Sequence, residues 1–161
     1  MSAKITVLSN KKGWEKIRKV FLNQTATKLN MGFFAEDTYG SENNNLPVPV
    51  VAAWQDLGTP FAGAEHIPAR PFMSVGLKDL LKSSAYKSIY KKSFLDMLSG
   101  QSVLNQYKDI SNKVIPDMVQ VIDGWSQPPN ADSTIRLKGG VDDPLVETGK
   151  MRDSFKTKVE K

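Results

Sequence analysis

The sequence has no cysteine and only one histidine, His66, among its 161 residues. Without cysteine there can be no disulfide scaffold, thiolate metal site or cysteine nucleophile, and one histidine cannot form a multi-histidine site. No segment approaches the roughly 20 consecutive apolar residues needed to cross a bilayer, and the apolar part of residues 1–8 is too short for a signal peptide. We therefore expect no cofactor, no metal and no membrane contact.

The sequence also lacks the common signatures of catalysis. General acid–base and nucleophilic catalysis need paired groups within hydrogen-bond reach, and the chain contains no GxxxxGK[ST], HExxH, GxSxG or GxGxxG motif. The remaining candidates are carboxylates such as Asp142, Asp143 and Glu147, which are more typical of turns and helix caps. His66 lies in a linker and is interpreted as a surface or backbone-bonded histidine. The sequence therefore predicts that the protein is not an enzyme.

Charge of one sign is only moderately in excess, with 22 basic and 17 acidic residues and a formal net charge of +5. We expect this charge to be spread widely, where it favours nucleic acid or an acidic protein surface and also keeps a small protein soluble. Trp14, Trp54 and Trp125 fall on apolar stripes, for which a core position is the default. A basic nucleic-acid-binding module stays an alternative, although no zinc finger or aromatic–basic stacking motif supports it.

A chain of this length forms one domain, because it can bury roughly 70% of its unfolded surface. We therefore assign residues 1–161 to a single domain. Within it, residues 37–49 hold a glycine, three consecutive asparagines and two prolines, a composition with too little apolar surface to order itself. We predict a mobile loop there, or alternatively a hairpin tip.

Apolar residues at three- and four-residue steps predict four helices. A basic amphipathic helix is expected at Lys12–Thr25, and a short one at Val48–Leu57 that Gly58 ends. A long helix capped by Ser74 follows and is broken at Ser99–Gln101. A second long helix, Val103–Trp125, keeps its stripe through Pro116, which indicates a kink rather than an end.

Three short strands are predicted. Lys4–Leu8 is rich in β-forming residues, Met31–Ala35 is an apolar run between Asn30 and a turn-rich stretch, and Ser154–Val159 alternates like a half-buried strand. The long helices would pair as an antiparallel hairpin or flank the sheet that these strands form. The predicted fold class is therefore α+β, with a small sheet packed against long amphipathic helices, extended loops and a C-terminal docking segment.

The docking segment is residues 128–161. Pro128 and Pro129 end the preceding helix, and Asp132 or Ser133 is expected to cap a helical turn through Lys138, with a strand as the alternative. Thr148 is expected to cap a second turn. Because the segment is so rich in turn formers, we expect it to contribute to assembly rather than to the core.

Several motifs between about Val50 and Val159 resemble a known family. They are Gln55-Asp-Leu-Gly-Thr59, Ile67-Pro-Ala-Arg-Pro-Phe72, Pro128-Pro-Asn-Ala131 and Pro144-Leu-Val-Glu-Thr-Gly-Lys-Met-Arg152. Together they resemble the tail-completion and neck proteins, or head–tail joining proteins, of long-tailed bacteriophages. Asp56-Leu57 departs from the Glu-Phe usual in that family, and residues 38–49 have no counterpart in its pattern.

The resemblance implies a structural virion protein of the phage neck or tail, which completes the tail and joins it to the head. Family members form a ring, commonly a hexamer, that contacts a head-closure or connector protein and a tail tube or tail terminator protein. DNA passes through the lumen, where non-specific contacts are expected. The implied location is the virion, and the host cytoplasm during assembly. A tail terminator subunit elsewhere in the tail is an alternative.

The expected assembly interface combines residues of these motifs. Arg70, held on an extended backbone between prolines, suits an interface salt bridge because its planar fork pairs two oxygens, but a bond to a carbonyl of its own chain is an equal alternative. The full set of expected interface residues is Asp56, Arg70, Phe72, Arg136, Lys138, Leu145, Thr148 and Arg152.

Overall fold

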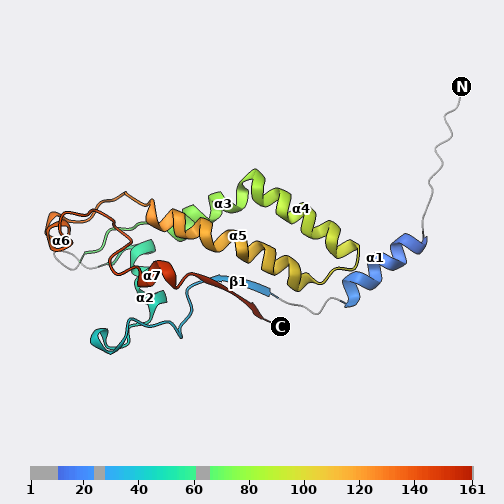
Figure 1. Cartoon of the computed structure of the whole chain (residues 1–161), viewed down its shortest axis with the longest axis horizontal. Coiled ribbons are helices and arrows are strands. Elements are labelled where there is room, and N and C mark those ends of the chain that lie inside the picture. Colours follow the sequence, from blue (N-terminus) through green and yellow to red (C-terminus); the bar gives the residue numbers. More distant parts are fainter. Residues whose placement is uncertain (1–10, 24–27, 61–65, 161) are drawn as a thin grey trace, which may run out of the picture.

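The computed structural model describes residues 11–23, 28–60 and 66–160, and shows a small α+β fold (Figure 1). The strand expected at Lys4–Leu8 lies outside the described residues. The described helices are α1 (Lys11–Asn23), α2 (Val48–Leu57), α3 (Lys78–Lys82), α4 (Ser84–Leu98), α5 (Val103–Asp123), α6 (Asp132–Leu137) and α7 (Lys150–Asp153). The strands are β1 (Lys28–Gly32) and β2 (Lys156–Glu160). A 3₁₀ turn at Ser41–Asn43 and a π-helical turn at Phe72–Leu77 complete the elements.

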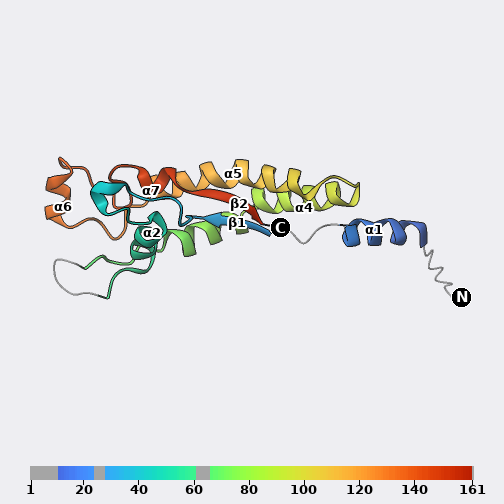
Figure 2. The ribbon, with the colours of Figure 1, turned by 90° about the horizontal axis from the view of Figure 1, so that it is seen from below.

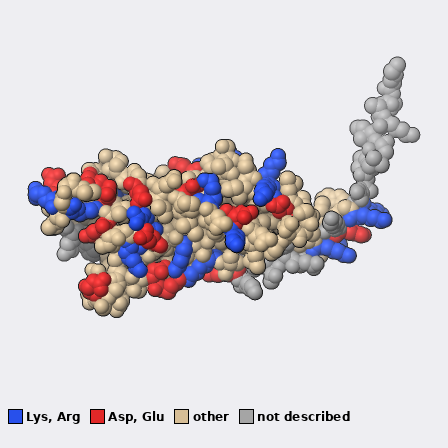
Figure 3. All heavy atoms as spheres, viewed as in Figure 1, with Lys and Arg blue, Asp and Glu red and all other residues tan. Residues whose placement is uncertain are grey.

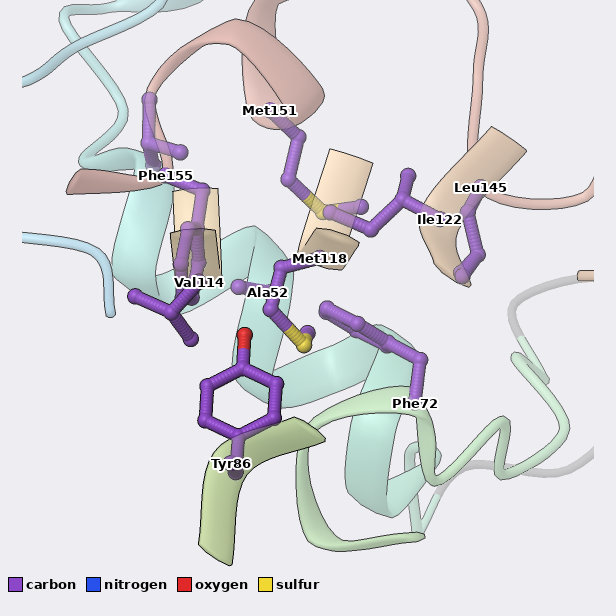
Figure 4. Packing of buried hydrophobic residues seen from close by; sticks show 10 residues of the cluster. Ala52, Phe72, Tyr86, Val114, Met118, Ile122, Leu145, Met151 and Phe155 are labelled. Atoms are coloured by element: carbon purple, nitrogen blue, oxygen red, sulfur yellow. The ribbon is translucent and has the colours of Figure 1, made fainter. Parts of the chain in front are cut away.

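The long helix α5 is the centre of the fold. Its apolar stripe is buried at Ile110, Val114, Met118 and Ile122, as the periodicity predicts. The helix runs without interruption through Pro116, whose side chain faces solvent. Proline in a helix interior removes one backbone hydrogen bond, and here it does so on the exposed side, so the buried stripe is unaffected. Figure 4 shows Val114, Met118 and Ile122 of this stripe packed against side chains from α2, from α4 and from residues 145–155, which we call the closing residues.

The two strands form an antiparallel pair that lies against α5. The register runs from Lys28 opposite Glu160 to Gly32 opposite Lys156, and the Thr157 hydroxyl donates a hydrogen bond of 2.7 Å to Ser111 on α5. The expected small sheet against a long helix is confirmed. The first strand is shifted toward the N-terminus, because Phe33 leaves the ladder to pack edge-on against Phe72 and Phe155.

The single long helix expected from the Ser74 cap to the break at Ser99–Gln101 is wrong. The chain forms the π-helical turn and α3, breaks at Ser83, whose backbone is extended (φ −63°, ψ 157°), and restarts as α4. The Ser83 hydroxyl accepts a hydrogen bond from the Tyr86 amide, which is the capping that the sequence analysis gave to Ser74. The break rotates the helix, so Tyr86 is buried while Ala85 and Leu95 are exposed.

Helices α4 and α5 form the antiparallel hairpin that was one of the two expected arrangements (Figure 1). Gly100, with φ 94°, makes the turn between them. The buried Tyr86 hydroxyl donates to Asp117 at 3.0 Å, and Lys113 completes the cluster at 2.7 Å from the same carboxylate. Burial and the bond to Asp117 both raise the pKa of the Tyr86 hydroxyl. The hydroxyl therefore stays protonated and available as a donor that ties the two helices together.

Residues 37–49 form a hairpin rather than a loop without structure. The Tyr39 amide donates to the Leu46 carbonyl at 3.0 Å, and the Val48 amide donates to the Asp37 carbonyl at 2.8 Å. Asn44 and Asn45 adopt positive φ at the tip, which asparagine tolerates better than most residues. The hairpin-tip alternative is therefore what the structure shows. The composition argument for a mobile loop overlooked these local backbone bonds and the burial of Val48.

Part of the docking segment, residues 128–161, contributes to the core. The expectation that this segment serves assembly rather than the core is therefore corrected. Leu145, Met151 and Phe155 are buried in the main apolar cluster. Residues 132–137 are helical, so the strand alternative is wrong, and the N-cap is Ala131 rather than Asp132 or Ser133. The turn-forming residues of this segment did not prevent the burial of its apolar side chains. They allow the chain to fold back, so that α7 contacts both α5 and α2.

The described molecule is elongated. α1 lies at one end and α6 at the other, as Figures 1 and 2 both show. The hairpin of residues 37–49 and α2 lie toward the α6 end. Surfaces at the two ends can therefore contact different neighbours without interfering with each other.

Candidate assembly surfaces

Arg70 is an internal residue whose side chain is 4% exposed. Its Nε donates to the Pro128 carbonyl at 2.9 Å, and its two terminal nitrogens donate to Gln55 Oε1 at 2.7 Å and to the Pro129 carbonyl at 3.1 Å. Burial lowers the pKa of Arg70, and the charge of Asp142 acts in the opposite direction. Arg70 therefore takes the alternative of bonding to carbonyls of its own chain, and the expectation of an interface salt bridge is corrected.

The neighbouring motif residues are also structural. Asp56 Oδ1 accepts hydrogen bonds from the amides of Met73 (2.8 Å) and Ser74 (3.4 Å), at the start of the π-helical turn. Thr59 and Ile67 exchange two hydrogen bonds, one of them through the Thr59 hydroxyl. Three stretches that carry the family resemblance, residues 55–59, 67–72 and 128–130, thus meet around the Arg70 guanidinium.

Gly58 allows this close approach. Its φ is 76°, and a Cβ at this position would lie 2.9 Å from the Ile67 carbonyl oxygen. Only glycine combines the left-handed backbone with the missing side chain. Gly58 is therefore required by backbone packing at this position.

Two further expected interface residues, Phe72 and Leu145, lie in the core. Phe72 has no exposed surface, and Leu145 is buried beside Ile122 (Figure 4). Apolar side chains in a turn-rich sequence cannot be assigned to the interior or the surface without knowing which partners the fold brings to them. The prediction that they form an interface is wrong for the described chain.

The remaining expected residues stay at the surface. Lys138 donates to the carbonyls of Asp143 and Val146 and so fastens α6 to the following loop. Arg152 pairs with Asp153 at 2.7 Å and with Asp123 at 3.3 Å, and hydrogen bonds to these two carboxylates raise its pKa. Of the eight residues, Arg136 and Thr148 are exposed, and Asp56, Lys138 and Arg152 are partly exposed.

A groove separates the hairpin of residues 37–49 from the closing residues, and we call it the hairpin groove. It is lined by the apolar side chains of Tyr39, Leu46, Val51, Leu145 and Met151 and by polar residues that include Gln55, Asn130, Thr134, Lys138, Glu147, Thr148 and Lys150. A second hollow, which shares Tyr39, Asn43, Thr148 and Lys150 with the groove, adjoins it and is lined by Glu42 as well. Burial and the charge of Glu147 raise the pKa of Tyr39, so the Tyr39 ring contributes a neutral surface. The hairpin groove is therefore lined by apolar and polar side chains in similar measure.

Several large apolar side chains are exposed, including two tryptophans, Trp14 and Trp54, that the sequence analysis placed in the core by default. On α1, Trp14 is 70% exposed and Leu22 is 71% exposed, so the default core position for Trp14 is wrong. Other large exposed apolar residues are Phe94, Leu95 and Leu104 near the turn of the helical hairpin, and Trp54 and Leu57 on α2. The amphipathic period of α1 correctly predicted a helix. It did not show whether Trp14 is buried by the rest of its own chain.

The net charge is concentrated at one end rather than spread. Residues 28–161 contain 16 basic and 16 acidic residues, so the formal +5 resides entirely in residues 1–27. The 13 residues of α1 alone contain four lysines, one arginine and one glutamate. Figure 3 shows the mixed signs over the body and the basic side chains on α1. The prediction of widely spread charge is wrong.

Among the described residues, no group of three or more His, Cys, Asp or Glu side chains is placed to hold a metal ion. His66 is exposed. None of the helices that the structure describes is long and apolar enough to cross a membrane. Comparison with known proteins found no matching family model, no similar curated protein and no similar solved structure.

Proposed function

We propose that this chain is a structural subunit of a bacteriophage neck or tail, which assembles into a ring that completes the tail and joins it to the head. In this role it makes or breaks no covalent bond. Its partners are further copies of itself, in a ring that is commonly a hexamer in the family it resembles, a head-closure or connector protein, and a tail tube or tail terminator protein. Its place is the virion, after assembly in the host cytoplasm.

The observation that carries this proposal is the exposed apolar surface of α1 at Trp14, which lines a shallow hollow together with Ile17. Burying a side chain such as Trp14 contributes about 2 kcal/mol, and an exposed apolar hollow is typical of a contact with another protein. The convergence of three family-like motifs around Arg70 also supports the proposal. These motifs build one junction of the fold, as motifs shared by a family do when they maintain its architecture.

A direct test is the mass of the purified full chain in solution and its appearance by electron microscopy. We expect particles whose mass is a fixed multiple of 17.9 kDa and whose outline is a closed ring. In a phage that encodes this chain, deleting its gene should leave heads and tails unjoined, and supplying the gene in trans should restore particles. Infectious particles formed without the gene would contradict the proposal.

A basic nucleic-acid-binding module is the second candidate, favoured by the concentration of positive charge on α1. Binding through phosphates falls steeply as salt rises. DNA binding by the purified chain that disappears between low and physiological salt, with no ring at any concentration, would favour this candidate over the first.

A further inference from the structure

We propose that α1 of one copy docks into the hairpin groove of a neighbouring copy, so that each ring contact is head-to-tail. This inference rests on the proposed ring function and names the contact that closes the ring. The two surfaces belong to the same chain but lie at opposite ends of the elongated molecule (Figure 2). α1 is thus placed to meet the groove of another copy.

The apolar parts of the two surfaces fit each other. An amphipathic helix commonly lays its apolar face into an apolar groove of its partner. α1 offers the exposed indole of Trp14 beside the half-buried Ile17. The hairpin groove offers the half-buried side chains of Tyr39, Leu46 and Val51. A partner of DNA or another polyanion would pair with the lysines but would leave these apolar side chains in water.

The charges are complementary as well. The polar side of α1 is basic. The groove presents the exposed carboxylate of Glu147 and the exposed ammonium group of Lys150, and the adjoining hollow adds the exposed carboxylate of Glu42. The carboxylates of Asp142 and Asp143 are exposed in the loop that leads to the groove. The ammonium group of Lys138, which also lines the groove, is turned to two backbone carbonyls. Opposite charges around the groove steer association and select the register of the helix in the groove.

Such a contact is heterologous, because it uses two different patches of the same chain. Heterologous contacts generate rings when the rotation between neighbours closes and filaments when it does not. The end-to-end placement of α1 and the groove allows every subunit to use both patches at once. The same contact, repeated around an axis, therefore covers every α1 in the assembly.

The absence of cysteine from the chain permits a clean crosslinking test on the full-length protein. One preparation carries Lys11→Cys, which leaves Trp14 in place, and the other carries Asn43→Cys beside the groove. On mixing and mild oxidation we expect a disulfide-linked dimer, while Lys11→Cys mixed with Ser88→Cys on the exposed side of α4 should give none. Rings that crosslink equally through Ser88→Cys, or through two copies of Lys11→Cys, would overturn the docking inference and leave the proposed function standing.

A charge swap tests the same contact without crosslinking. Lys12→Glu with Lys19→Glu, or Glu42→Lys with Glu147→Lys, should each raise the dissociation concentration of the ring at least about tenfold. Mixing the two variant proteins should recover assembly, since reversed α1 then faces a reversed groove. Failure of the mixture to recover assembly overturns the inference. A chain that stays monomeric and whose α1 variants instead lose binding to duplex DNA or to vesicles containing phosphatidylserine overturns both the inference and the proposed function.

Discussion

The Thr157 hydroxyl on β2 donates a hydrogen bond of 2.7 Å to the Ser111 hydroxyl on α5. This contact joins residues 46 positions apart and places the closing strand on the central helix. Together with the buried Phe155 next to it, it shows that the C-terminal residues support the fold in addition to any part they take in assembly.

A truncation after Pro129 is therefore expected to unfold the protein. It removes Leu145, Met151 and Phe155 from the core and deprives β1 of its partner strand. The point variant Phe155→Ala should lower the free energy of unfolding by about 3–5 kcal/mol. Thermal and urea denaturation measure both effects. The control Leu137→Ala, at a side chain 89% exposed, should change the free energy of unfolding by less than about 0.5 kcal/mol. A chain truncated after Pro129 that still melts cooperatively would contradict the predicted loss of folding.

Arg70→Ala should destabilise the fold rather than weaken assembly alone. It leaves the Pro128 and Pro129 carbonyls and Gln55 without their donor, and each buried group left unsatisfied costs about 1–3 kcal/mol. We expect a loss of about 3 kcal/mol, only partly recovered by Arg70→Lys because an ammonium cannot reproduce the planar fork. The exposed Arg136→Ala is the matched control. Equal melting temperatures of the Arg70→Ala and Arg136→Ala variants would contradict the internal role of Arg70.

Stability should fall in acid through Glu36. Its hydrogen bond to Lys158, followed by a backbone hydrogen bond and the bond to Lys156, lowers its pKa from the ordinary 4.5 to about 2. A carboxylate with a lowered pKa stabilises the fold above its unfolded pKa, and that contribution is lost as pH falls toward the folded pKa. The melting temperatures of wild type and Glu36→Gln should differ at pH 6 and converge between about pH 4.5 and 2.

The convergence should also be seen on adding salt, which screens exposed pairs. Asp132→Asn, at an exposed carboxylate on α6 that takes no part in this ion pair, is the matched control and should show no such convergence. A difference between wild type and Glu36→Gln that stays constant down to pH 2 would show that the ion pair with β2 contributes nothing.

Pro116→Ala should leave the protein folded and raise its stability by about 1 kcal/mol or more. Alanine restores the amide hydrogen that proline lacks, and proline is about 3 kcal/mol less favourable than alanine in a helix interior. Circular dichroism should show unchanged or slightly increased helix content. Gln120→Ala, one turn further along the exposed side of α5, controls for helix propensity. A loss of folded protein would show that the proline ring itself packs against something essential.

Features set by neighbouring residues could be predicted from the sequence. The bounds of α2 match the expected Val48–Leu57, and the stripe of α5 lies in the core as its period indicates. The stop at Gly58 and the break at Gly100 follow from glycine's freedom to adopt positive φ. In each case the physical cause lies within a few residues of the feature.

Features set by distant partners could not be predicted. Phe72 and Leu145 were expected at an interface because nothing in their surroundings identifies the apolar neighbours that bury them. Trp14 was expected inside because an amphipathic period does not show whether its own chain covers it. The apolar pattern continues through Ser83, but the helix breaks there. A serine side chain can bond to a nearby backbone amide in place of the helical hydrogen bonds, and at Ser83 it caps α4.

The strand pairing links Lys28 to Glu160 and Gly32 to Lys156, so its partners are separated by more of the chain than almost any other contact. Pairings with long sequence separation form slowly, because the intervening loop must close first. During synthesis on the ribosome, β1 emerges long before β2, so the backbone N–H and C=O groups of β1 stay unpaired until β2 is made. We expect completion of the native body to follow release of residues 156–160 from the exit tunnel, which makes nascent β1 the segment most exposed to mispairing between chains.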